Sequence, residues 1–146
     1  MRTFAKSKPI MPQRMDITVK YYELQQVLQS TKTSTYGHDF ISAVNDSVYK
    51  LMPRGAAYLD NVASELKVSQ SKLRRRIHNY TGITPANYIM MLRMGEALRL
   101  LNVYPRYNIS TIAMLCGFAD HSHFTHTFIR FFGQSPMQYV QEHGLA

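Results

Sequence analysis

The sequence predicts an all-α fold of seven helices, and three observations support this prediction. From residue 39 onward, apolar residues recur at three- and four-residue spacing, which is the pattern of amphipathic helices. No alternating apolar and polar run of useful length is present, so no strand is expected. The helical region also repeats itself about 50 residues further along the chain, which indicates that one small helical unit occurs twice.

The composition is that of a small, basic, globular protein. The 146 residues include 17 Lys and Arg against nine Asp and Glu, a formal net charge of +8, and 45% are hydrophobic. This charge balance indicates a polyanionic partner, with nucleic acid ahead of an anionic membrane surface. No apolar run is long enough to cross a membrane, and no apolar stretch follows the basic start as a secretion signal requires.

Cysteine usage points to a reducing compartment. Cys116 is the one cysteine, so an internal disulfide and a multi-cysteine zinc site are both excluded. We therefore predict a cytoplasmic protein without a membrane partner.

Residues 1–38 differ from the rest of the chain. They carry six basic and two acidic residues, a net charge of +4, beside prolines and a run of Ser and Thr. We interpret them as a basic N-terminal tail that is partly disordered or forms a short dimerisation element. A homodimer or a partner regulator would be held through this tail, and residues 39–146 would form the folded domain.

Three helices are expected in a first lobe, about residues 39–83. The first carries an apolar stripe over 40–51 and ends near a proline, and the second is short, over 59–66. Ser69 is a good N-cap for the third helix, and Gly82 ends it.

The fourth helix is expected to link two lobes, over about residues 85–104. Thr84 is a capping residue, Pro85 suits the first helical position, and Pro105 lies just beyond the expected end.

A second lobe, about residues 108–142, is expected to hold the last three helices. Asn108 caps the fifth helix, which Gly117 ends, and Asp120 caps the sixth. A Ser-Pro pair at 135–136 opens the seventh.

The internal repeat defines the unit more closely. Val62-Ala63 matches Ile112-Ala113 at an offset of 50, and after one inserted residue Leu73 matches Phe124 at an offset of 51. Each copy reads as a short helix, a break of three to four residues and a longer helix. This is the helix-turn-helix pattern, so the chain is predicted to hold a homeodomain-like pair of such units.

The length of the linking helix suits two DNA contacts. From Pro85 to Val103 is 19 residues, which is about 28 Å of helix at 1.5 Å per residue. Successive major-groove entries on one face of DNA lie about 34 Å apart. One monomer is therefore predicted to read two adjacent major-groove segments.

Five motifs in the helical region carry a family resemblance. They are Val62-Ala63-x-x-Leu66-x-Val68-Ser69-x-Ser71-x-Leu73-x-Arg75-x-Ile77, Thr81-Gly82-x-x-Pro85, Arg93-Met94-x-x-Ala97-x-x-Leu100-Leu101, Ile109-Ser110-x-Ile112-Ala113-x-x-Cys116-Gly117-Phe118 and Phe132-Gly133-Gln134-Ser135-Pro136. With these motifs, the region from Asp39 to Val140 resembles the DNA-binding domain of the AraC/XylS family of bacterial transcription regulators. The resemblance implies a two-lobed fold that binds DNA to control transcription, as in the output domain of hybrid sensor regulators or in a small stand-alone member.

The chain departs from the family pattern at three places. Thr111 stands where an acidic residue is common, and Val140 stands where a basic residue is common. The second recognition helix carries histidines where relatives often have Arg or Lys. An ion pair or phosphate contact of the relatives is therefore expected to be missing here.

The first recognition helix carries most of the candidate DNA contacts. Its inward face is expected at Leu73, Ile77 and Tyr80, so the opposite side faces the groove. An arginine there can make a bidentate contact with guanine, worth about 1–3 kcal/mol of discrimination. The alternative is a merely solvated charged face. We assign Ser71, Arg74 and Arg75 to bases, and Lys72, Arg76 and His78 to phosphates.

The second recognition helix offers candidate DNA contacts with fewer Lys and Arg residues than the first. Ser122, His123 and His126 are expected to point outward near its N-terminus, with Thr125 and Arg130 completing the contacts. Because histidines gain charge near neutral pH, we expect the affinity for DNA to rise as the pH falls from about 8 to 6.

A zinc site beside Cys116 is the alternative use of these histidines. It is disfavoured because His121 and His123 diverge on a helix and Cys116 belongs to an apolar face. No metal and no cofactor are therefore predicted. The four phenylalanines of the same helix are expected in the core rather than in a base-stacking platform.

Three further arginines have an open role. Arg93 and Arg99 on the linking helix, and Arg106 after it, are expected either to touch phosphates or to pair with Glu96.

The predicted function is a sequence-specific double-stranded DNA-binding transcription regulator. No nucleophile–base pair, paired carboxylates or glycine-rich phosphate loop appears, so an enzyme is not expected. One alternative is a protein-interaction module of the same fold that holds RNA polymerase or another regulator and binds DNA weakly. The other is an antagonist that pairs with a full-length relative through residues 1–38.

Overall fold

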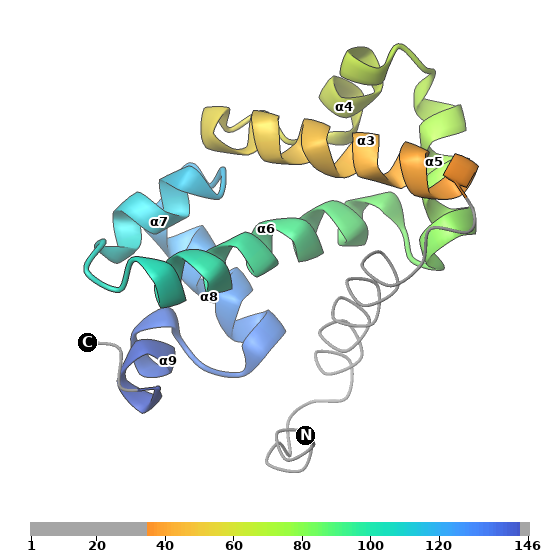
Figure 1. Cartoon of the computed structure of the whole chain (residues 1–146). Helices are drawn as coiled ribbons and strands as arrows, with labels where there is room; N and C mark the ends of the chain where they lie inside the picture. Colours follow the sequence, from red (N-terminus) through yellow and green to blue (C-terminus); the bar gives the residue numbers. More distant parts are fainter. Residues whose placement is uncertain (1–34, 144–146) are drawn as a thin grey trace.

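In a computed structural model of the chain, the structure describes residues 35–143, with side chains from residue 39 (Figure 1). The described residues form α-helices and one short 3-10 turn and contain no strand, so the expected all-α fold is confirmed. Most of the predicted basic tail, residues 1–38, lies outside the described residues. The elements are α3 (Thr35–Leu51), η1 (Met52–Arg54), α4 (Leu59–Leu66), α5 (Gln70–Thr81), α6 (Pro85–Val103), α7 (Ile109–Leu115), α8 (His121–Phe132) and α9 (Pro136–Glu142).

Local capping sets most helix ends, as the sequence predicted. A side-chain oxygen at each N-cap accepts a hydrogen bond from the backbone N–H three residues on, which satisfies one of the donors that a helix start leaves unpaired. These N-caps are Ser69, Thr84, Asn108, Asp120 and Ser135. The first helix differs, because α3 starts at Thr35, before its apolar stripe begins.

Two three-helix lobes lie at the two ends of α6. Helices α3, α4 and α5 form the first lobe, and α7, α8 and α9 form the second (Figure 1). Helix α6 runs between them and packs against elements of both, including α3 and α5 on one side and α7 and α9 on the other.

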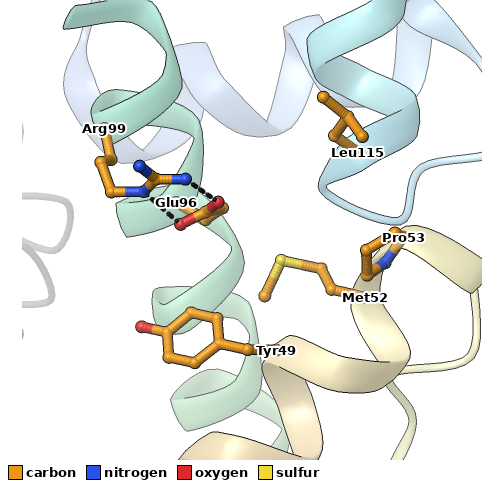
Figure 2. Close-up of a pocket in the computed structure, with 6 residues that line it drawn as sticks. All are labelled: Tyr49, Met52, Pro53, Glu96, Arg99 and Leu115. Atoms are coloured by element: carbon orange, nitrogen blue, oxygen red, sulfur yellow. Dashed lines mark hydrogen bonds and ion pairs between the residues drawn. The ribbon is translucent and has the colours of Figure 1, made fainter. Parts of the chain in front are cut away.

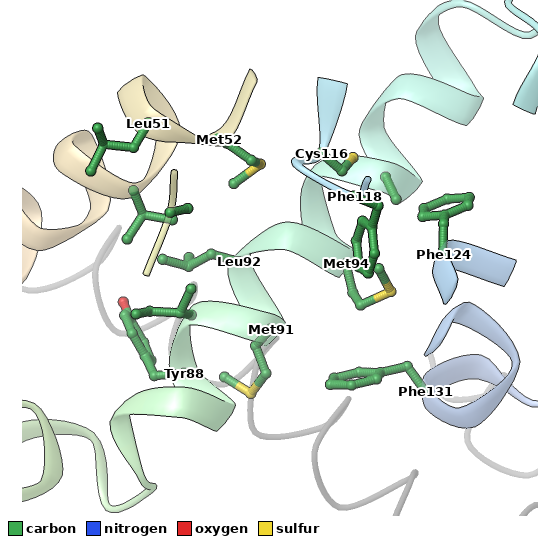
Figure 3. Close-up of a cluster of buried hydrophobic side chains, with 14 of the residues drawn as sticks. Leu51, Met52, Tyr88, Met91, Leu92, Met94, Cys116, Phe118, Phe124 and Phe131 are labelled. Atoms are coloured by element: carbon green, nitrogen blue, oxygen red, sulfur yellow. The ribbon is translucent and has the colours of Figure 1, made fainter. Parts of the chain in front are cut away.

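The buried residues of α6 belong to both lobes. Nearly half of its 19 residues are buried, which is typical of a helix surrounded by others rather than of a surface helix. Figure 3 shows side chains of α3 and η1, such as Leu51 and Met52, on one side of α6 and those of the second lobe, such as Phe118 and Phe124, on the other. The apolar core is therefore continuous through the linking helix.

Candidate nucleic-acid interface

The first helix-turn-helix consists of α4, a tight turn and α5. Lys67 ends α4 in the left-handed conformation, with φ of 58°, and its N–H donates back into the helix. The N–H of Val68 then donates to the carbonyl oxygen of Ala63 at 3.1 Å. Ser69 caps α5 by accepting from the N–H of Lys72.

The second helix-turn-helix, made of α7 and α8, repeats this geometry. Gly117 takes the left-handed position, with φ of 90°, and the N–H of Phe118 donates to the carbonyl oxygen of Ala113 at 2.9 Å. Its turn is one residue longer, with Asp120 as the N-cap of α8. The repeat in the sequence is therefore a repeat of hydrogen bonds, with the predicted one-residue insertion inside the second turn.

Helix α5 presents a polar face with three exposed Lys and Arg residues. Leu73 and Ile77 are fully buried, as predicted from their spacing, which turns the opposite face outward. Within residues 39–143, the exposed side chains of Arg74 and Arg75 have no hydrogen-bond or ion-pair partner, so they are available to a ligand. The exposed members of the predicted contact set on α5 are Ser71, Lys72, Arg74, Arg75 and His78.

Arg76 is placed differently from its neighbours. It is half-buried, and its guanidinium lies over the ring of Phe40 of α3 at 3.9 Å from the centroid. A cation–π contact of this kind is worth about 0.5–1 kcal/mol at an exposed site. Arg76 therefore holds α5 against α3, and its assignment to a phosphate stays a prediction.

Helix α8 presents a polar face of lower charge. Phe124 and Phe128 are fully buried, so their expected place in the core is confirmed. The ring of His123 meets that of Phe118 edge-on at 5.1 Å. The exposed residues of the predicted set on α8 are Ser122, His123, His126 and Arg130.

Thr125 is the member of the predicted set that the structure covers. The residue is half-buried, and its hydroxyl oxygen is shielded from solvent without a hydrogen-bond partner among the described residues. A covered hydroxyl cannot reach a base edge or a phosphate without a change of rotamer. Its assignment to DNA stays a prediction that this geometry does not favour.

The expectation for Arg93 is wrong. It was expected to touch phosphates or to pair with Glu96, yet it is 6% exposed and donates to the backbone carbonyl oxygens of Cys116 and Gly117, each at 2.9 Å. Arg99 does pair with Glu96, with both oxygens of that carboxylate accepting. Arg106 is exposed, and its phosphate contact remains untested.

Cys116 is a buried core residue, as predicted. Its side chain is fully buried, and this burial raises the pKa of the thiol to about 12. Among residues 35–143, no three His, Cys, Asp or Glu side chains lie together as metal ligands.

The two recognition helices differ in charge. Helix α5 contains four Lys and Arg residues, whereas α8 contains only Arg130, and neither contains an acidic residue. Lys67, in the first turn, is an exposed cation beside α5 that the sequence analysis did not select. Its place in the turn of a helix-turn-helix unit is the sequence feature that could have predicted it as a DNA contact.

An open cleft of about 410 Å³ lies where the two lobes meet (Figure 2). Its residues are Tyr49, Met52, Pro53, Glu96, Arg99 and Leu115. Because Arg99 and Glu96 neutralise each other, we assign the cleft no ligand. No helix in the described part of the chain is long and apolar enough to span a membrane.

Known families and solved structures share this helix-turn-helix architecture. A family model described as a helix-turn-helix domain matches residues 62–142, which is more than half of the chain. The chain is 38% identical over 80 residues to the HTH-type transcriptional activator RhaS of Escherichia fergusonii and 38% identical over 77 residues to RhaS of Escherichia coli K12. These matches cover 55% and 53% of the chain but only 28% and 27% of the relatives.

Solved structures show the same architecture. The C-terminal domain of AraT, a response regulator from Geobacillus stearothermophilus, matches 68% of the chain and 81% of that domain, with a TM-score of 0.62 and 28% identity. The DNA-binding domain of AdpA in complex with a target DNA matches 59% of the chain and 77% of that domain, with a TM-score of 0.55 and 27% identity.

The resemblance seen in the sequence is thus confirmed by a family model, by relatives and by structures. The matched residues contain the second helix-turn-helix unit, the helix that joins the two units, and the first unit from within α4 onward. The chain belongs to the AraC-type helix-turn-helix family.

Proposed function

We propose that the chain binds double-stranded DNA in a sequence-specific way and regulates transcription. The observation that carries this proposal is the pair of helix-turn-helix units with matching turns, each presenting an exposed polar face. Support comes from the similarity to the AdpA domain, whose structure was solved with its target DNA. A regulator of this kind acts in the cytoplasm, and the proposal assigns the chain no catalytic step.

In this proposal α5 and α8 enter two adjacent major-groove segments. Arg74 and Arg75, with Ser71, read bases through α5, and Lys72 and His78 contact phosphates. On α8, polar side chains read bases near the N-terminus, namely Ser122, His123 and His126. With three exposed Lys and Arg residues on α5 against one on α8, the first lobe supplies most of the charge-dependent affinity.

The direct test is selection of bound sequences from a random duplex pool at about 0.15 M salt, a physiological ionic strength. Two sequence blocks centred about 10–10.5 bp apart are expected, because that is one turn of DNA between half-sites. One block would mean that α8 does not read bases. No enrichment would contradict the proposal and favour the protein-interaction alternative.

Salt dependence supplies a second, independent readout. With about six phosphate contacts, a plot of log K against log salt should have a slope near −5, because each contact contributes about −0.9. A slope close to zero for a bound duplex would contradict the proposed electrostatic contacts.

A second candidate function is contact with RNA polymerase or another regulator. The low number of Lys and Arg residues on α8 favours it, because a helix with one such residue gains less from phosphates. In this second candidate function, residues 1–38 hold a homodimer or a partner regulator. The match covers only 28% of the longer relative RhaS, so an upstream sensing part and the sign of regulation remain part of the proposal.

A further inference from the structure

The charged residue that is buried within the described region lies in the middle of α6. Arg93 is 6% exposed and has no carboxylate partner among residues 39–143. Its Nε donates to the carbonyl oxygen of Cys116 and its Nη2 to that of Gly117, each at 2.9 Å. The ring of Phe118 lies against the guanidinium at 4.1 Å. One side chain of the linking helix thus contacts three consecutive residues of the second turn.

Burial of this guanidinium is unfavourable by itself. Desolvation lowers the pKa of Arg93 from its ordinary value. Carbonyl oxygens compensate for lost water through charge-assisted hydrogen bonds, which are stronger than those between neutral groups. The two hydrogen bonds to the turn are therefore contacts that the folded state needs rather than incidental surface contacts.

Gly117 also lies close to the backbone of the first lobe. A Cβ built on this glycine would lie 2.8 Å from the carbonyl oxygen of Met52 and 3.5 Å from Nη2 of Arg93. Met52 belongs to η1, so the first lobe, α6 and the second turn meet around one residue that has no side chain. A larger residue at this position would have to displace the backbone carbonyl of Met52.

The first turn shows that the helix-turn-helix alone does not require this glycine. The position matching Gly117 is Lys67, which also adopts a left-handed φ, and its side chain is exposed. The second turn differs by one inserted residue, by a φ of 90° against 58° at this position, and by its contact with the first lobe. Glycine at 117 therefore serves the junction between lobes as well as the turn.

We propose that Arg93 and Gly117 are positioning residues that lock the second helix-turn-helix against the first lobe and so set the separation of α5 from α8. This inference rests on the proposed function for its consequence on DNA. A fixed separation restricts tight binding to one spacing of the two half-sites, whereas a loosened junction tolerates several.

The first test needs no DNA. Spin labels on Asn79→Cys in α5 and Met137→Cys in α9, both exposed positions, report the distance between the lobes by pulsed electron spin resonance. Buried Cys116 stays unlabelled. We expect one narrow distance distribution for the parent protein and a broader or shifted one for Arg93→Met and Gly117→Ala.

Matched controls separate locking from a general loss of structure. Arg99→Met changes an exposed arginine on the same helix, and Lys67→Ala changes the matching position of the first turn. Both should keep the narrow distribution, and circular dichroism should show the same helix content in all folded variants. If Arg93→Met does not fold, Gly117→Ala and Arg93→Lys decide the question. Unchanged distances in the folded junction variants would overturn the proposal.

The second test uses DNA with selected half-sites whose centres are 9 to 12 bp apart. The parent protein should prefer one spacing by at least about tenfold, or 1.4 kcal/mol, and Arg93→Met should lose that preference. The salt slope should stay unchanged, because no phosphate contact is removed. An equal loss of affinity at every spacing would contradict the proposed role. If the parent protein binds no duplex, the proposed function fails, and the spin-label distances still decide the locking.

Discussion

At the scale of single residues, tertiary contacts divide a run of similar side chains into different roles. Arg74, Arg75 and Arg76 are consecutive, yet the first two are exposed and the third lies over Phe40. Three successive residues spread over about 200° of a helix, so they cannot share one environment. Arg93, on the linking helix, has yet another environment, because it donates to backbone carbonyl oxygens of the second lobe.

The exposed Arg75 should carry base discrimination. Arg75→Ala should weaken binding to the selected duplex by about 1–3 kcal/mol and relax the preference at one base pair, because a bidentate contact to guanine is lost. Competition between matched and single-base-changed duplexes measures this, with Asn79→Ala on the same helix as the control. An equal loss across all sequences would assign Arg75 to a phosphate.

Cys116 should be unreactive in the folded protein. Because burial raises its pKa to about 12, the folded thiol stays protonated where an unfolded thiol, with a pKa near 9, would ionise. At pH 8, labelling by a thiol reagent should follow unfolding in urea rather than the concentration of the reagent. Rapid labelling without denaturant would contradict this burial.

The same shift predicts the effect of alkaline pH. A folded pKa above the unfolded value means that the stabilisation from Cys116 is fully present below about pH 9 and is lost as the pH rises toward 12. Cys116→Ala should remove that part of the pH dependence.

At the scale of elements, short polar side chains decide where the recognition helices begin. Ser69 and Asp120 occupy the same place in the two units, immediately before α5 and α8. Each accepts a hydrogen bond from the third backbone N–H of its helix. The position of the exposed polar face therefore depends on a cap that lies outside it.

Removal of the cap on α8 should destabilise the fold. Asp120→Ala should lower the free energy of unfolding by about 1 kcal/mol, and Asp120→Asn should retain most of it, because Asn caps as well as Asp does. Urea titration followed by circular dichroism gives both values. Equal stability of the alanine and asparagine variants would show that the hydrogen bond to the N–H of His123 contributes nothing measurable.

At the scale of the whole molecule, the two lobes share one core. Buried residues from α3 through α9 form a single cluster that passes along α6. Neither lobe can separate from α6 without exposing part of that cluster. The lobes are therefore expected to fold and unfold together.

A single unfolding transition is the corresponding prediction. Unfolding monitored by circular dichroism and by reporters at Asn79 in the first lobe and Met137 in the second should give coincident curves. Leu92→Ala, which truncates a buried side chain of α6, should lower the free energy of unfolding by about 2–5 kcal/mol, and all three signals should report the same decrease. Two separate transitions would show that the core divides at α6.

Much of this protein was determined by its sequence alone. Helix ends followed from caps and glycines, and the buried and exposed faces of α5 and α8 followed from residue spacing. The repeat predicted two matching turns, which the hydrogen bonds of Val68 and Phe118 confirm. These features depend on interactions between residues a few positions apart, so local pattern is enough to predict them.

Only the tertiary structure decided which polar groups are covered. Arg93 reaches partners 23 and 24 residues away, Gly117 meets a carbonyl oxygen of the first lobe, and the hydroxyl of Thr125 is shielded. A charged residue on a helix reads as a surface residue until the neighbouring element is placed against it, because burial is a property of the packed chain. The exposed faces of the two recognition helices were therefore readable from the sequence, whereas the junction that holds them relative to each other was not.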